Sequence, residues 1–415
     1  MADLIVSVED AQADLDQIVS MVGEEHWKRK YFKLSKSWPH LDLQPYLLQH
    51  HSIEMQVGQT LNGGGGVNRI GEDQLDALQQ DALIFGHLSM RLARVLPEPL
   101  RLADHIRGYL NNNQNLRPYL FEIETCNTLQ LRGFSVRLTD LLDEAQHDFL
   151  ATLNEESIAV ECKHVSGDAG MTIHRSEALE LFDRIIGYCT RRGIDLNLLH
   201  IDVRIPERLD IDRVSRLCFE SLSEFQDKVS DVATVRCRRI SPEVLTRLTE
   251  IQEAADHPEL QHQQLNETLG IEGSNHLYIR GTRAEIRIIS LSSATPSTPI
   301  PKIFKRLIDD TKRQLPDNLP GVLMVEMSDV EAGNTDFFAR HEGGHPIGEH
   351  IAELFTRRPH VAGVSFVAGV RNTGSGHPWA QAGGAIHRPS LVFRNRTHPM
   401  HDNPLLLTAL GPSLD

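Results

Sequence analysis

Residues 147–163, HDFLATLNEESIAVECK, contain two apolar, strand-like runs joined by one polar segment. The polar run 154–157 is the only place between them where a turn fits, because turns favour Asn, Asp, Ser and Gly. The stretch therefore predicts a β-hairpin with strands at about 147–154 and 157–165. Three charged side chains interrupt these otherwise apolar strands: Asp148, Glu161 and Lys163.

The spacing of these charges predicts that they share one face of the hairpin. Successive side chains of a strand point to opposite faces, so Glu161 and Lys163 lie on the same side. If the turn is centred between residues 155 and 156, Asp148 lies directly opposite Lys163. In the same register Leu150 is the partner of Glu161. Paired residues project to one face, so we expect two carboxylates beside one ammonium group.

Such a patch favours a metal-dependent hydrolytic site. Carboxylate oxygens are hard ligands that suit Mg²⁺ or Mn²⁺. A metal bound there can polarise a phosphoryl oxygen and lower the pKa of bound water. Lys163 can orient or deprotonate that water, or neutralise developing charge. The alternative is a surface ion pair, which contributes little. The apolar neighbours indicate buried strands, however, in which charges are costly unless they pair or bind a metal.

A helix is predicted just before this hairpin, over residues 116–132. Pro118 falls in its first turn and Gly133 follows its end, as is typical of helices. Helix, then D-F-L, then a strand ending in E-C-K resembles the PD-(D/E)xK nuclease superfamily, which has the restriction-endonuclease-like fold. One difference is that His147, rather than proline, precedes the aspartate.

The resemblance implies roles for particular residues. Asp148, Glu161 and Lys163 correspond to the catalytic and metal-binding residues of the family. A glutamate of the preceding helix often assists the metal, and Glu122 fits that role, with Glu124 as the alternative. The resemblance therefore implies Mg²⁺ or Mn²⁺ bound by Asp148, Glu161 and Glu122.

The family's core continues with a helix and a strand, and two segments compete for that place. One is the predicted helix 174–193 with the strand 196–205, and the other is the helix 302–315 with the strand 321–327. The sequence K-R-Q-L-P before an apolar strand favours the second pair. We therefore expect an α/β protein: a restriction-endonuclease-like mixed sheet flanked by helices, with an N-terminal helical region and an inserted α/β unit. The expected divisions are 1–112 (mainly helical), 113–170 (first part of the nuclease core), 171–295 (insertion) and 296–415 (second part of the core and C-terminal extension).

The charge of the chain bears on its partners. The formal net charge of −15 argues against a protein that coats nucleic acid through bulk charge. The segment from His276 to Asp317 is nevertheless basic, with eight Lys or Arg and four Asp or Glu residues. Lys305 and Lys312, seven residues apart, are expected on one face of the helix 302–315. The expected contacts to nucleic-acid phosphates are Lys305, Lys312, Gln314, Arg283 and Arg287.

A second motif, His341-Glu342-Gly343-Gly344-His345, matches the H-E-x-x-H pattern of zinc proteases. That chemistry needs both histidines on one face of a helix. The two internal glycines and the following Pro346 disfavour a helix. A glycine-rich loop is the favoured interpretation, and a zinc metalloprotease is a remote alternative.

These patterns together predict a metal-dependent nuclease that hydrolyses phosphodiester bonds of DNA. The competing prediction is a non-catalytic nucleic-acid-binding or complex-forming protein on the same fold. A homodimer is implied by analogy with nucleases that cut duplexes as pairs. The five cysteines form no C-x-x-C pair, and neither a signal peptide nor a long apolar run is present, so we expect a cytoplasmic protein with no membrane partner.

Overall fold

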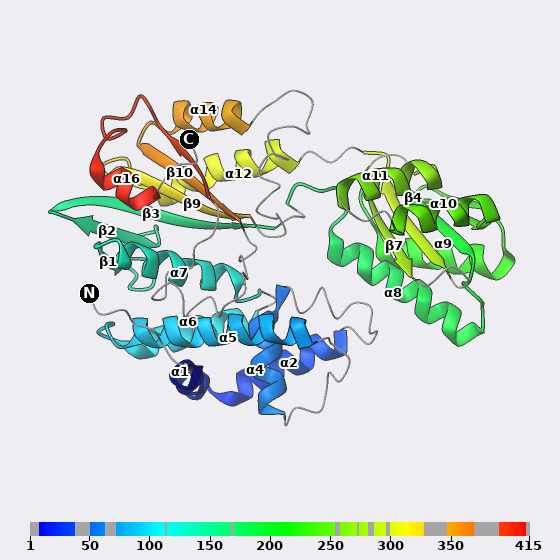
Figure 1. Ribbon diagram of the computed structural model, residues 1–415, viewed down its shortest axis with the longest axis horizontal. Helices are drawn as coiled ribbons and strands as arrows, with labels where there is room; N and C mark the ends of the chain where they lie inside the picture. The colour runs from blue at the N-terminus through cyan, green and yellow to red at the C-terminus, as the bar shows by residue number, and fades with distance from the viewer. Residues whose placement is uncertain are drawn as a thin grey trace. The chain divides into compact units, whose positions relative to one another are not determined.

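The computed structural model describes residues 8–37, 50–62, 72–112, 114–166, 169–253, 258–271, 274–280, 286–295, 299–327, 347–368 and 390–411. The chain divides into two compact units, which are coloured by residue number in Figure 1. Unit 1 combines Met1–Gly167 with Ile303–Asp415, and unit 2 is Asp168–Lys302. Each unit contains a mixed sheet and helices, so the α/β class expected from the sequence is confirmed.

The N-terminal part of unit 1 is helical in its described residues. Its helices are α1 (Val8–Val22), α2 (Glu24–Ser37), α4 (Ser52–Leu61), α5 (Glu72–Ala93) and α6 (Pro99–Asn111). Their apolar side chains belong to the same buried cluster as α7 (Arg117–Leu131) and the sheet. This cluster runs from Ala11 through Phe85 and Leu120 to Val160 and Leu410. The N-terminal helices therefore share one core with the sheet.

The sheet of unit 1 has six strands in the order β1-β2-β3-β9-β10-β11. The central pairs β3/β9 and β9/β10 are parallel, and the outer pairs are antiparallel. Figure 1 shows α7 and the N-terminal helices on one face, with α12 and α14 on the other. The strands are β1 (Ser135–Leu138), β2 (Phe149–Leu153), β3 (Glu156–Val165), β9 (Gly321–Met327), β10 (Val361–Ala368) and β11 (Ser390–Arg394), and the helices α12 (Pro299–Gln314), α14 (Ile347–Arg357) and α16 (Pro404–Leu410).

The pairing of β2 with β3 differs from the expected register by two residues. Leu150 pairs with Ala159 and not with Glu161. The strands are joined by Asn154 and Glu155, which have positive φ values of 50° and 70°. Two-residue turns with positive φ fit the twist of paired strands, and Asn tolerates this conformation. The turn centre lies one residue earlier than predicted. Because the change in pairing is an even number, every side chain keeps its face.

Unit 2 contains a five-stranded sheet in the order β5-β6-β4-β8-β7, in which only β4 and β8 are parallel among the described strands. The helix and strand within 174–205 thus belong to unit 2. The strand that pairs with β3 is β9, which comes from the later segment that the sequence favoured. The separate unit, Asp168–Lys302, is slightly longer than the expected insertion 171–295. Its elements are α8 (Arg175–Arg192), β4 (Leu199–Ile205), α9 (Ile211–Glu224), β5 (Lys228–Val229), β6 (Thr234–Arg239), α10 (Pro242–Glu253), α11 (Pro258–Leu269), β7 (Ser274–Arg280) and β8 (Arg287–Ser293).

The cysteines are packing residues in the structure. All five are free and buried, and burial raises the pKa of the Cys126 thiol to about 12. A buried thiol with a raised pKa is a poor nucleophile. In the described part of the chain, no helix combines the length and the apolar character that crossing a membrane requires.

Candidate active site

Asp148, Glu161 and Lys163 are brought together by the β2–β3 hairpin. Continuing the pairing of β2 with β3 by one step sets Asp148 opposite Glu161, not opposite Lys163 as the sequence predicted. The even-numbered residues Val160 and Cys162 of β3 belong to the core on the α7 side, so Glu161 and Lys163 face the side of α12. Glu161 and Lys163 thus share one face and form an ion pair, and Asp148 is linked to the same strand through the Cys162 N–H.

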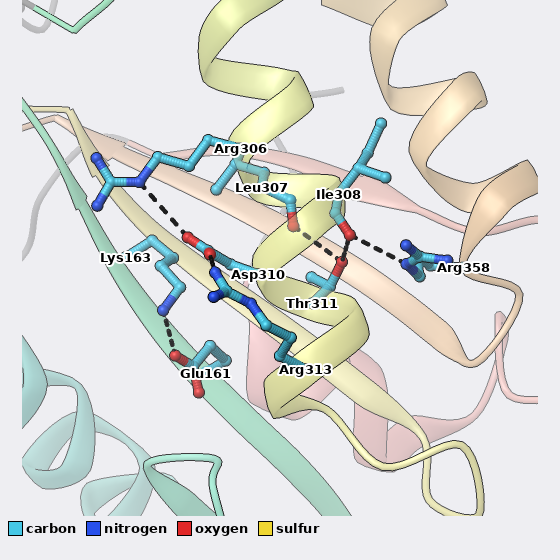
Figure 2. A network of polar contacts seen from close by, with 9 residues as sticks. All are labelled: Glu161, Lys163, Arg306, Leu307, Ile308, Asp310, Thr311, Arg313 and Arg358. Atoms are coloured by element: carbon cyan, nitrogen blue, oxygen red, sulfur yellow. Dashed lines mark hydrogen bonds and ion pairs between the residues drawn. The ribbon is translucent and has the colours of Figure 1, made fainter.

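The contacts of the two carboxylates differ. Lys163 Nζ donates to Glu161 Oε1 at 2.5 Å, as Figure 2 shows. Asp148 Oδ2 accepts the backbone N–H of Cys162 at 2.6 Å. Glu161 is only 1% exposed, and its second oxygen, Oε2, is buried without a hydrogen-bond partner in the described chain. A buried carboxylate oxygen without a partner is costly, because it has lost water and gained nothing in return.

Burial shifts the pKa values of both carboxyls upward, and the charge of Asp148 adds to the rise at Glu161. Burial raises the pKa of Asp148 to about 6, although the Cys162 N–H and the Lys163 charge oppose the rise. Burial, followed by the negative charge of Asp148, raises the pKa of Glu161 to about 8, although Lys163 and the backbone N–H of Asp148 oppose the rise. The anionic form of the pair is therefore strained, and a cation would stabilise it. Perturbed carboxyls of this kind are typical of functional sites.

Of the two glutamates proposed on α7, Glu122 is the one near this pair. Its pKa is raised well above the usual value, first by burial and then by the charges of Asp148 and Glu161. Glu124 is buried elsewhere, beside a smaller cavity of about 70 Å³ that is also lined by Arg132. The structure therefore associates Glu122, and not Glu124, with the two strand carboxylates.

A polar cavity of about 880 Å³ lies beside Lys163. One part of its lining comes from the connection between β1 and β2, and another part comes from α12. Its size is in the range of sites that accept ligands. The lining residues are Asp140, Asp143, Glu144, Ala145, Gln146, Lys163, Arg306, Asp310, Arg313 and Gln314.

The cavity changes which residues of α12 are candidates for substrate contact. Gln314, predicted from the sequence, lies in the lining. Lys305 and Lys312 are exposed on α12 but do not belong to the lining, where Arg306 and Arg313 stand instead. Both pairs have the same seven-residue spacing, so periodicity alone does not choose between them.

Of the remaining predicted residues, one belongs to unit 2 and the others fall outside the described chain. Arg287 begins β8 of unit 2, where its Nε donates to Asn197 Oδ1 at 3.3 Å. Arg283 and the motif 341–345 fall outside the described residues, so the structure says nothing of them. His164 Nδ1 contacts Glu326 Oε2 at 2.7 Å across the β3/β9 pair.

The carboxylates can serve as metal ligands only in a site completed by other oxygens. In the ranges that the structure describes, no group of three or more His, Cys, Asp or Glu side chains has the arrangement of a metal site. Mg²⁺ is commonly bound by one or two carboxylates, with waters and substrate phosphates supplying the rest. Asp148 and the unpartnered Oε2 of Glu161 fit that limited role.

No protein-family model, no curated protein and no solved structure matches this chain. The candidate site is consequently supported by the residues of this chain and their geometry.

Proposed function

We propose that this protein is a Mg²⁺- or Mn²⁺-dependent nuclease of the PD-(D/E)xK kind, which hydrolyses phosphodiester bonds of DNA. The observation that carries the proposal is the group of the buried Glu161 with the half-buried Asp148 and Lys163 at the β2–β3 hairpin. The unpartnered oxygen of Glu161 and the cavity beside Lys163 give this group the properties of a reactive site.

The order of elements around the hairpin supports the restriction-endonuclease-like fold. α7 precedes three antiparallel strands, and α12 comes before β9, which pairs in parallel with β3. This is the helix, three strands, helix and strand that the resemblance implies for the core. Unit 2 then occupies the connection between β3 and α12 as the proposed insertion.

The proposed reaction assigns a task to each side chain. Asp148 and Glu161 would hold the cation, and Glu122 would assist from α7. When bound, the cation would supply Lewis acidity and lower the pKa of the attacking water. Lys163 is already fixed by Glu161, so its ammonium is positioned to orient the attacking water or to stabilise charge that develops on the phosphoryl group.

The direct test is cleavage of DNA by the full chain with Mg²⁺ or Mn²⁺ and with three variants. Asp148→Asn, Glu161→Gln and Lys163→Ala should each remove cleavage, while the wild type is active only with the divalent metal. Glu155→Gln is a matched control, because this glutamate is exposed in the turn of the same hairpin. Its activity should equal that of the wild type.

The outcomes separate a nuclease from a protein that only binds. If the wild type binds DNA but cuts neither DNA nor RNA with any divalent metal, the non-catalytic alternative replaces the proposal. If the three variants unfold while Glu155→Gln does not, the charged group is structural. Thermal unfolding of each variant, measured beside its activity, distinguishes these cases.

A further inference from the structure

Arg306 and Arg313 of α12 converge on one carboxylate at the wall of the polar cavity. Arg306 Nε lies 3.5 Å from Asp310 Oδ2, and Arg313 forms an ion pair with Asp310 Oδ1. Figure 2 shows the two guanidinium groups meeting at Asp310, next to the Glu161–Lys163 pair. The two arginines therefore line the same cavity as Lys163.

The helix that carries these arginines is held against the sheet by other contacts. Phe304 and Leu307 are buried, and the Phe304 ring lies 5.9 Å from the ring of Phe366 on β10. Arg358 Nε donates to the carbonyl oxygen of Ile308 at 3.0 Å. The position of α12 thus does not depend on Arg306 and Arg313, whose side chains are 78% and 71% exposed.

The charge on this wall suits a polyanion. Two guanidinium groups share one carboxylate, which leaves one excess positive charge on the part of the lining that α12 supplies. Each guanidinium has five N–H donors in a planar fork, so donors remain after the bond to Asp310. Such forks match the oxygens of phosphate groups, and an anchored arginine loses less conformational entropy on binding than a free one.

The acidic part of the lining shows why the excess is local. Asp143 and Glu144 from the β1–β2 connection line the cavity, and each has an arginine partner of its own, Arg101 and Arg137. Asp140 of the same connection also lines the cavity, without an ion pair in the described chain. The positive excess is therefore confined to the α12 part of the lining. A polyanion would be attracted along α12.

We propose that Arg306 and Arg313 bind phosphate groups of the nucleic-acid strand that enters the cavity beside Lys163, and that Asp310 positions them. This inference rests on the proposed nuclease function, because it assigns the substrate strand to one wall of that site. The arginines are seven residues apart, or about 10 Å along the helix. That length covers about three steps of rise along a DNA strand, so the pair can contact more than one phosphate.

The test is a salt titration of binding to a short fluorescent DNA duplex, made with the full chain carrying Lys163→Ala to prevent cleavage. Arg306→Gln/Arg313→Gln should lower the slope of log affinity against log salt by about 1.8, the value for two lost phosphate contacts. With this slope change, the ratio of the parent's affinity to the variant's affinity falls about tenfold when the salt concentration rises fourfold.

Two further variants distinguish contact from general charge and from misfolding. Lys305→Ala/Lys312→Ala removes two positive charges from the same helix outside the cavity, and it should change the slope much less. Arg306→Lys/Arg313→Lys keeps the charge and should restore the slope, but with weaker binding because the planar fork is lost. Thermal unfolding should be close to that of the parent in all three.

The result that overturns the inference is an unchanged slope in Arg306→Gln/Arg313→Gln, or an equal loss in Lys305→Ala/Lys312→Ala. Absence of any duplex binding overturns it as well. If the protein binds inorganic phosphate but no duplex, the arginines form a small-anion site instead. Cleavage by the wild type is measured separately. An active enzyme with an unchanged slope contradicts only the proposed role of Arg306 and Arg313 in binding phosphate. A slope change in a protein that never cuts contradicts only the nuclease function.

Discussion

The two sheets of this protein both place polar groups on their central strands, but they treat those groups differently. In unit 2, Ser290 Oγ donates to Asp202 Oδ1 at 2.9 Å and lies 2.9 Å from His200 Nε2. The single hydroxyl proton goes to Asp202, so His200 must donate through Nε2. Burial lowers the pKa of His200, which keeps the ring neutral. Every member of this network has a partner.

In unit 1, the buried charges are incompletely satisfied. Glu161 is as deeply buried as Ser290, yet one of its oxygens has no partner in the described chain, and the pKa values of Glu161 and Asp148 are raised. Fully satisfied polar networks stabilise a fold and make it specific, whereas unsatisfied ones cost stability. The unit 2 network has the properties of a structural one, whereas the unit 1 group has those of the ligand site proposed above. Stability, acidity and metal content each test this distinction.

The largest difference is expected in stability. Ser290→Ala leaves the buried His200 and the half-buried Asp202 without their shared partner and should lower the free energy of unfolding by about 1–3 kcal/mol. Glu161→Gln removes a strained charge and should change it by no more than about 1–2 kcal/mol, or raise it. Thermal or urea unfolding of the full chain measures both.

The exposed Ser223→Ala substitution on α9 is the control for the first variant and should stay within about 0.5 kcal/mol. The comparison fails if Glu161→Gln is the more destabilising change.

A smaller effect is expected in the pH dependence of the metal-free protein. Raised pKa values mean that the folded chain holds protons on Asp148 and Glu161 more tightly than the unfolded chain does. This contribution to stability is present at low pH and is lost as the pH rises through about 6 and about 8. In a chelator, the contribution of this site to the unfolding temperature should therefore fall between about pH 4 and about pH 8.

Mn²⁺ should oppose that fall, because a bound cation replaces the protons, and its affinity should increase with pH. Glu161→Gln should make the pH dependence shallower. A wild-type curve identical to that of Glu161→Gln, with no shift by Mn²⁺, would remove the basis for a strained carboxylate pair.

The smallest effect is expected at the second motif. His341→Ala and His345→Ala should leave both cleavage and bound metal unchanged, because the sequence there disfavours the helix that a zinc site requires. Metal analysis of the purified variants checks this. Stoichiometric Zn²⁺ that disappears on either substitution would favour the zinc-protease alternative.

The sequence predicted the faces of the hairpin better than its register. Alternation of side chains depends only on strand geometry, so the common face of Glu161 and Lys163 followed from their spacing. The register depends on the turn, and a positive φ at Glu155 is not evident from the residue type. The unpartnered oxygen of Glu161 also depends on packing from several elements, which no local pattern contains.

The choice of residues on α12 shows a second limit. The buried Phe304 and Leu307 identify the face of the helix that packs on the sheet. Lys305 and Arg306 lie next to that face, and the orientation of the helix over β3 decides which of them lines the cavity. That orientation is a tertiary property. The pairing of β3 with β9 also cannot be predicted from a local pattern, because partners such as His164 and Glu326 are 162 residues apart in the sequence.

The insertion of unit 2 has a consequence for the order in which the protein folds. Its ends are held close to each other, because Thr172 Oγ1 donates to the carbonyl oxygen of Thr295 at 3.3 Å, and Lys302 Nζ to that of Gly170 at 3.4 Å. A folded unit 2 therefore acts as a short loop between β3 and α12, which lowers the entropic cost of pairing β3 with β9. During synthesis, α7 and the hairpin emerge first and can form from local contacts. The arginines of α12 follow more than a hundred residues later. We expect the carboxylates to be assembled early and the phosphate-binding wall last, so a nascent chain would acquire its affinity for nucleic acid only when unit 2 is complete.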